Sequence, residues 1–281
     1  MDYRKKFRVE PGSRVSLAQL DPSFTGKNAS ESDVADVLAD DARRLRLLQD
    51  RLWAEHARAV LIVLQAMDAG GKDGTISHVF AAINPQGTFV HSFKEPTPLE
   101  QAHDFLWREH RAAPAHGEIG IFNRSYYEAV LVERVDQLVP KKVWSKRYER
   151  INDFEKTLGQ SGTVVLKFFL HISPDEQLRR FADRLNDPHK QWKISAADYS
   201  ERTRWDEYMG AYKDLLERCS TDEAPWYVIP ANHKWFRNLA VSRILVDTLD
   251  ELDPRYPKPS VDLEEIRRKY HLGAAAPPTT S

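Results

Sequence analysis

The chain has 281 residues, 41% of them hydrophobic, which is enough for one large α/β domain with additions. Its formal net charge of −1 provides no overall field for nucleic acid, and no apolar run is long enough to cross a bilayer. We therefore expect no nucleic-acid or membrane partner and a cytoplasmic location. The single cysteine, Cys219, excludes an internal disulfide, and we expect it to be buried in a helix.

Residues 1–55 are expected to form an accessory arm that is loop-rich at first and ends in a helix. Leu38, Leu45, Leu48 and Leu52 recur at helical spacing up to the first predicted strand. That strand, Ala59–Gln65, is a run of buried type, rich in β-branched residues.

The segment 66–75 after this strand has the build of a phosphate-binding P-loop. Glycines allow backbone N–H groups to surround an anion, the next helix points its positive end at it, and Lys72 adds a fixed charge. The general motif has Gly where this chain has Ala66, and a magnesium-binding hydroxyl where it has Asp73. Thr75 could supply a displaced hydroxyl, and Asp68 could hold magnesium. The alternative is an ordinary glycine turn.

Strands and helices then alternate. Strands are predicted at 88–93, 118–122, 163–171 and 226–230, with helices at 98–111, 143–158, 174–186, 197–219 and 234–252. This order predicts a three-layer α/β/α P-loop kinase fold with a mostly parallel sheet and a helical lid. The core domain is expected over 56–253, and 254–281 is expected to be a tail with a short helix and a disordered end.

Ligands of a parallel sheet bind beyond the carboxyl ends of its strands, so the polar residues there are site candidates. They include the loop 68–75, Lys94, Asn123 and Arg124. Asn123 could instead cap the following helix, and Glu128 could bind metal or water or simply be solvated.

Basic residues form two clusters, at 141–150 and at 179–193. The first could equally be a solvated helix face. In the second, Arg180 and Arg184 lie one turn apart on a helix, and Lys190 and Lys193 follow it, which predicts a phosphate-clamping lid at about 180–196.

Six motifs in this chain resemble the polyphosphate kinase 2 family, most closely its class III, over about residues 60 to 240. They are Asp68-Ala-Gly-Gly-Lys-Asp-Gly-Thr75, Phe93-Lys-Glu-Pro-Thr97, His103-Asp-Phe-Leu-Trp-Arg108, Phe122-Asn-Arg-Ser-Tyr-Tyr-Glu128, Asp187-Pro-His-Lys-Gln-Trp-Lys193 and Arg204-Trp-Asp-Glu-Tyr208.

The resemblance implies a magnesium-dependent homo-oligomer that transfers phosphate from inorganic polyphosphate to nucleotides. It places Lys72 on the transferring phosphates, Asp68 on magnesium, and Arg124, Arg134 and Arg184 on phosphate oxygens. Other classes usually have Asp and Asn where this chain has Asn123 and Glu128. Class III, which this pairing resembles, accepts nucleoside monophosphates and diphosphates, converting AMP to ADP and ADP to ATP.

The expected catalytic residues are therefore Asp68, Lys72, Arg124, Glu128 and Arg184, with Asp68 as metal ligand. Two other functions remain open, an ATP-dependent nucleoside monophosphate kinase similar to thymidylate kinase and a non-catalytic nucleotide- or polyphosphate-binding module. The expected phosphate- and nucleotide-binding residues are Ala69, Gly70, Gly71, Asp73, Gly74, Thr75, Lys94, Asn123, Arg134, Arg180, Lys190 and Lys193.

Overall fold

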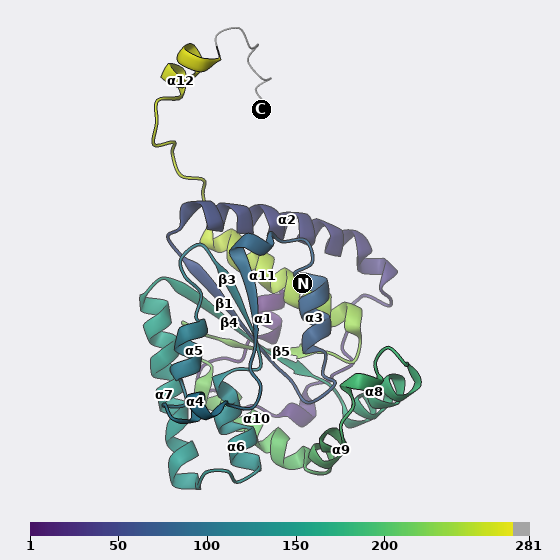
Figure 1. Ribbon diagram of the computed structural model, residues 1–281. Helices are drawn as coiled ribbons and strands as arrows, with labels where there is room; N and C mark the ends of the chain where they lie inside the picture. The colour runs from purple at the N-terminus through teal and green to yellow at the C-terminus, as the bar shows by residue number, and fades with distance from the viewer. Residues whose placement is uncertain (272–281) are drawn as a thin grey trace.

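The computed structural model describes residues 1–271, and the predicted disordered end from residue 274 lies outside them. Within this range the chain forms a five-stranded sheet in the order β2-β3-β1-β4-β5 (Figure 1). Neighbouring strands pair in parallel throughout. The strands are β1 (Ala59–Gln65), β2 (Thr88–Ser92), β3 (Ile119–Asn123), β4 (Thr163–His171) and β5 (Trp226–Pro230).

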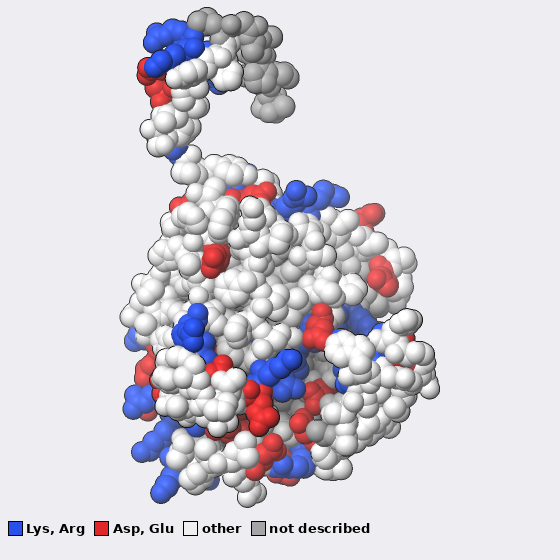
Figure 2. All heavy atoms as spheres, in the orientation of Figure 1, with Lys and Arg blue, Asp and Glu red and all other residues white. Residues whose placement is uncertain are grey.

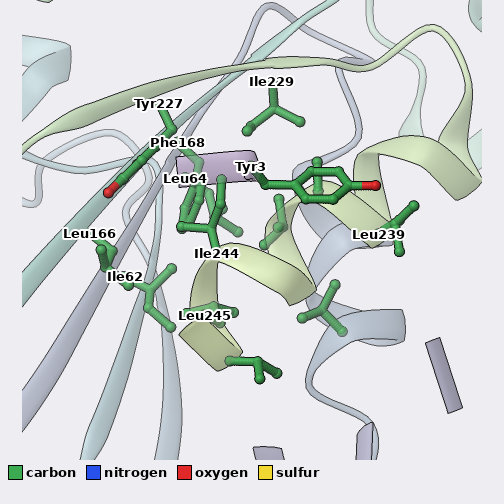
Figure 3. Packing of buried hydrophobic residues seen from close by; sticks show 14 of the residues in the cluster. Tyr3, Ile62, Leu64, Leu166, Phe168, Tyr227, Ile229, Leu239, Ile244 and Leu245 are labelled. Carbon is green, nitrogen blue, oxygen red and sulfur yellow. The ribbon is translucent and has the colours of Figure 1, made fainter. Parts of the chain in front are cut away.

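Helices cover both faces of the sheet, which confirms the predicted three-layer fold. Alternate residues of β1 serve the two cores because successive side chains of a strand point to opposite faces. Val60, Ile62 and Leu64 pack against one helical layer, shown in part in Figure 3, whereas Leu61 and Val63 pack against the other. The first layer contains α1 (Tyr3–Phe7), α2 (Ala35–Glu55), α3 (Lys72–Val79) and α11 (Lys234–Leu252); the second contains α5 (Trp107–Ala112), α6 (Val132–Val135), α7 (Lys141–Gln160) and α10 (Trp205–Cys219).

The N-terminal arm is fixed to the edge of the sheet beside β5. Tyr3 of α1 packs on Phe236 of α11, with ring centroids 6.2 Å apart. The Val9 N–H donates to the Trp226 carbonyl at 2.8 Å, and Arg8 forms an antiparallel bridge with Tyr227. The arm thereby covers an edge that would otherwise expose unpaired backbone groups.

Two of the predicted helices are wrong in extent, because each is divided in two. The segment 98–111 forms α4 (Pro98–Gln101) and then α5, since the Asp104 carboxylate accepts the Leu106 N–H at 2.9 Å and starts a new turn. The segment 197–219 forms α9 (Ala196–Thr203) and α10, which meet at Arg204. The shorter helix α9 carries Glu201, whose side chain hydrogen-bonds to Asp68 in the loop after β1.

The helix α8 (Pro174–Asn186) ends where Asn186 and Asp187 precede a proline, as predicted. It is followed by the short helix η5 (Gln191–Lys193) and by α9. Beyond α11 an extended segment leads to α12 (Leu263–Tyr270), which stands away from the body in Figure 1. No helix of the described residues has the length and apolarity needed to span a membrane. The remaining short helices are η1 (Leu17–Gln19), η2 (Ser32–Val34), η3 (Pro85–Gly87) and η4 (Tyr126–Val130).

Candidate active site

The glycine-rich loop connects β1 to α3 and depends on its glycines for close packing. A Cβ at Gly70 would lie 2.4 Å from the Ala66 Cβ, which no side chain tolerates. Gly71 has a φ of 109°, in the region that favours glycine, and Ala69 also has a positive φ of 57°. The loop therefore holds a conformation in which it delivers the N-terminus of α3 to the carboxyl edge of the sheet, where an anion can bind.

The first half of α8 braces this loop from the side. Gln177 donates to the Asp68 carbonyl at 3.0 Å, and Arg180 donates from Nη1 to the Ala69 carbonyl at 2.8 Å. Arg180 is 5% exposed, and its Nε donates to Glu176 at 2.6 Å. Its Nη2 donates to the carbonyls of Ala231 and Asn232. The Arg180 guanidinium thereby links the loop, the segment after β5 and Glu176. Its hydrogen-bond donors bond to acceptors of the protein itself in this structure.

Three of the expected catalytic residues meet at the loop. Lys72 Nζ donates to the Ala66 carbonyl at 3.0 Å, and Arg124 forms an ion pair with Asp68 at 3.3 Å. Burial alone would raise the pKa of the Asp68 carboxyl, but Lys72, Glu201 and Arg124 outweigh it and hold that pKa below its ordinary value. Burial and the charge of Arg124 lower the pKa of the Lys72 ammonium. Cations thus surround an ionised Asp68.

Glu201 of α9 lies against Asp68, a position that our sequence analysis did not anticipate. Burial raises the pKa of Glu201 to about 8, helped by its hydrogen bond with Asp68 and the charge on that carboxylate. The two carboxyl groups therefore share a proton near neutral pH. Both line a cavity of about 20 Å³, together with Arg124, Glu128 and Tyr212. That volume holds one water molecule or one small ion.

This donor set fits a magnesium ion. In the described part of the chain no group of three or more acidic, histidine or cysteine side chains is arranged to bind a metal. Mg²⁺ needs less from the protein, however, because it usually keeps several waters and binds one or two carboxylates plus substrate phosphates. Asp68 and Glu201 supply such a pair of carboxylates, and a cation would take the place of their shared proton.

Asp73 connects three parts of the site. Asn123 at the end of β3 donates to one Asp73 oxygen at 2.9 Å, and Lys193 of η5 donates to the other at 3.1 Å. Burial opposes ionisation, but these two hydrogen bonds keep the pKa of Asp73 below its ordinary value. Thr75 is buried and its hydroxyl donates to the Gly71 carbonyl at 3.1 Å. In this structure that hydroxyl therefore bonds to the helix backbone.

Other predicted site residues lie apart from the loop. Arg134 pairs with Asp214 at 2.7 Å and donates to the Tyr148 hydroxyl at 3.0 Å, within the second helical layer. Lys94 is exposed. Lys190 pairs with Asp187, three residues before it. Arg184 is closer to the site, because its Nη1 contacts the Lys193 carbonyl at 3.5 Å and its charge acts on Asp68.

A second residue that sequence reasoning missed is Arg237 of α11, which lies under Gly71 and Gly74. It follows β5, so the strand-end rule that selected Asn123 would have selected this region had it been applied to the fifth strand. No such signal exists for Glu201, because α9 is distant from any strand end in sequence.

A larger cavity than the one beside Asp68 lies away from the loop. It has a volume of about 440 Å³ and lies between the N-terminal arm, α2 and α11, where Tyr3, Asp36 and Arg243 line it. None of the predicted site residues contributes to it. Charged side chains of both signs instead gather in the hollow beside α8, as Figure 2 shows. The geometry of the loop, more than cavity size, identifies the candidate site.

A parallel sheet whose first strand leads into a glycine-rich, lysine-bearing loop, braced by an arginine of the helix α8, defines the class of P-loop phosphotransferases. Within that class, the chain belongs to the polyphosphate kinase 2 family, whose family model matches residues 28–257.

Individual relatives are similar over nearly their whole length. An AMP/ADP-polyphosphate phosphotransferase of Meiothermus ruber is 51% identical over 93% of this chain and 98% of its own length. An ADP-polyphosphate phosphotransferase of Rhodopseudomonas palustris is 44% identical over 90% of this chain and 92% of its own. The crystal structure of polyphosphate kinase 2 from Arthrobacter aurescens TC1 superposes with a TM-score of 0.92 at 43% identity, covering 95% of this chain and 96% of that one.

Proposed function

We propose that this protein transfers a phosphoryl group from inorganic polyphosphate to AMP and ADP. The observation that carries the proposal is the similarity to a relative that is named for that reaction. This chain is 51% identical to it over 98% of the relative's length. A second relative with 44% identity is named for the same donor and for ADP. The loop with Lys72 and Arg124 provides the cationic site that such a transfer needs.

The chemistry requires charge neutralisation more than a strong base. A terminal nucleotide phosphate has its second pKa at about 6 and is largely dianionic at neutral pH, so it can attack without general-base catalysis. Loop N–H groups, Lys72 and Arg124 would bind donor phosphates and hold the transferred group in line with the acceptor. Because polyphosphate is as densely charged as a nucleic-acid backbone, its binding is expected to weaken as salt rises.

Magnesium, the lid and assembly are further parts of this proposal. Asp68 and Glu201 would hold Mg²⁺, which when bound neutralises charge on the phosphates that exchange the phosphoryl group. Lys193 and Arg184 would close over the loop as a lid at about 180–196, supported by the contact of Lys193 with Asp73. We further propose that the protein is a homo-oligomer, that it acts in the cytoplasm, and that ATP is the product formed from ADP.

The test is an assay of the purified protein with Mg²⁺, in which AMP and ADP are offered separately with polyphosphate or, for AMP, with ATP as sole donor. ADP formed from AMP and ATP formed from ADP with polyphosphate are expected. Turnover with ATP alone would contradict the proposal and favour a nucleoside monophosphate kinase. Binding without turnover would favour a non-catalytic module.

A further inference from the structure

Arg237 lies directly beneath the phosphate-binding loop. It belongs to the first turns of α11 and is 2% exposed. A Cβ built on Gly71 would lie 2.0 Å from its Nη1, and one built on Gly74 would lie 3.2 Å from its Nη2. Its guanidinium therefore packs against the backbone of the loop and of the first turn of α3, in space that only glycines leave open.

The positive charge of Arg237 has no counter-charge in the described part of the chain. Its Nε and Nη2 both donate to the side-chain oxygen of Asn238, at 3.1 and 2.8 Å, and that acceptor is neutral. The nearby Arg180 has Glu176 as a partner at 2.6 Å, whereas Arg237 forms no ion pair with any side chain that the structure describes. Burial and the charge of Arg180 lower the pKa of Arg237 to about 9, so it remains protonated at neutral pH.

A buried charge without a partner destabilises a protein, and replacing it by an apolar side chain of similar volume is often neutral or stabilising. Buried charges in proteins are normally paired, and the sites where a natural chain departs from this are typically functional. At Arg237 the missing negative charge has one evident source. The open side of the same loop carries the α3 N-terminus and Lys72, both of which attract phosphate.

We propose that Arg237 is a positioning residue for polyanion binding, with a buried charge that is balanced only when a phosphate chain occupies the loop. This inference rests on the proposed function for the identity of the polyanion. It makes Arg237 an electrostatic support of the loop, acting through one layer of backbone, while Lys72 meets the phosphates directly. The ligand-free protein is then destabilised by Arg237, and the bound protein recovers that stability.

The test is calorimetric titration of the full-length protein with inorganic tripolyphosphate, combined with thermal denaturation without ligand. Arg237→Met should bind tripolyphosphate at least about tenfold more weakly, because a unit charge is lost from beneath the loop. Its Tm without ligand should equal or exceed that of the wild type. Arg237→Lys, which keeps the charge, should restore most of the affinity. In turnover, KM for polyphosphate should rise more than kcat falls.

The matched control is Arg179→Met, which removes a positive charge from the exposed side of α8 and has Glu176 and Asp183 as its partners. It should leave tripolyphosphate affinity nearly unchanged. Arg237→Met with wild-type affinity would overturn the inference. So would loss of binding in both Arg237→Met and Arg237→Lys with a lowered Tm, because that pattern indicates a packing role.

Titration with ATP separates this inference from the proposed function. If the wild type binds ATP and fails to bind tripolyphosphate, the proposed donor is wrong, and the Arg237 variants are then compared by their ATP affinity. If Arg237→Met binds ATP about tenfold more weakly than the wild type, Arg237 still strengthens phosphate binding at the loop. An unchanged affinity for ATP would overturn the inference.

Discussion

At the scale of single residues, the site concentrates opposite charges in a small, half-buried space. Asp68 faces Arg124 at 3.3 Å and shares a proton with Glu201, while Lys72 contributes a second cation. A carboxylate in an anion-binding loop repels phosphate unless a cation lies between them. The contacts of Asp68 therefore favour a metal-holding role over a role in packing.

Replacing Asp68 by Asn should lower kcat by about a hundredfold or more, since a preorganised group that stabilises the transferring phosphoryl charge contributes on this scale. Folding should be unaffected because the shape is preserved. The rate is measured with polyphosphate and ADP, and the thermal transition is measured in parallel. Asp183→Asn, on the exposed side of α8, is the control and should be as active as the wild type. Wild-type activity in Asp68→Asn would remove the metal assignment.

A buried carboxyl outside the loop predicts a pH effect on stability. Glu109 of α5 is 1% exposed, and burial raises its pKa to about 7 although Arg108 opposes this. Because the folded state binds this proton more tightly than the unfolded state, the contribution of Glu109 to stability falls as pH rises from about 4.5 to 7. In urea denaturation, the free energy of unfolding of Glu109→Gln should therefore rise relative to that of the wild type over this pH range. A difference between the two proteins that does not change with pH would contradict this.

At the scale of elements, a buried ion pair anchors η4, the short helix that follows Arg124. Lys167 of β4 and Glu155 of α7 are 2.6 Å apart and at most 1% exposed, and Lys167 also donates to the Tyr127 hydroxyl at 3.0 Å. Tyr126 donates to the same Glu155 at 2.7 Å. This network ties η4 to the sheet and to α7, and so fixes the position from which Arg124 and Glu128 reach the site.

Lys167→Met should lower the free energy of unfolding by about 3–5 kcal/mol, because it leaves the charge of Glu155 buried without a partner. The double variant with Glu155→Leu should recover most of that loss. Urea denaturation of the single and double variants measures both effects. A single variant as stable as the wild type would show that the pair contributes nothing to the fold.

The proposed lid should affect how polyphosphate binding depends on salt concentration. Lys193 pairs with Asp73 in this structure and would exchange that partner for a phosphate of the donor. In Lys193→Ala, the slope of the logarithm of polyphosphate affinity against that of salt concentration should become shallower by about one. Lys190→Ala is expected to act in the same direction. Lys156→Ala, on exposed α7 surface away from the loop, should keep the wild-type slope, and an unchanged slope in Lys193→Ala would exclude this contact.

At the scale of the whole molecule, the sequence predicted the fold well because β1, β3, β4 and β5 are buried, mostly apolar runs bounded by turn residues. The bounds of β4 and α8 match the prediction. Asn123 and Arg124 at the end of β3 meet the loop, as parallel topology requires, whereas Lys94 does not. The division of 98–111 was missed because it depends on the side chain of Asp104, which competes with the helix for a backbone N–H.

The site was harder to predict where it depends on distant packing. Asp68, Lys72 and Arg124 follow strands directly, so their meeting could be inferred from order alone. Glu201 lies on α9, which is separated from α10 at Arg204, and no local pattern indicates that this helix packs against Asp68. Arg134 was expected on phosphate from family resemblance, whereas the structure places it against Asp214.

The most direct test of the central claim is ATP formation from ADP and polyphosphate with Mg²⁺, measured for the wild type and for Lys72→Met side by side. The wild type should form ATP, and Lys72→Met should be slower by about a hundredfold or more while remaining folded, because the loop loses its fixed charge. No ATP from the wild type would contradict the proposed reaction, and an equally fast Lys72→Met would contradict its location at the loop.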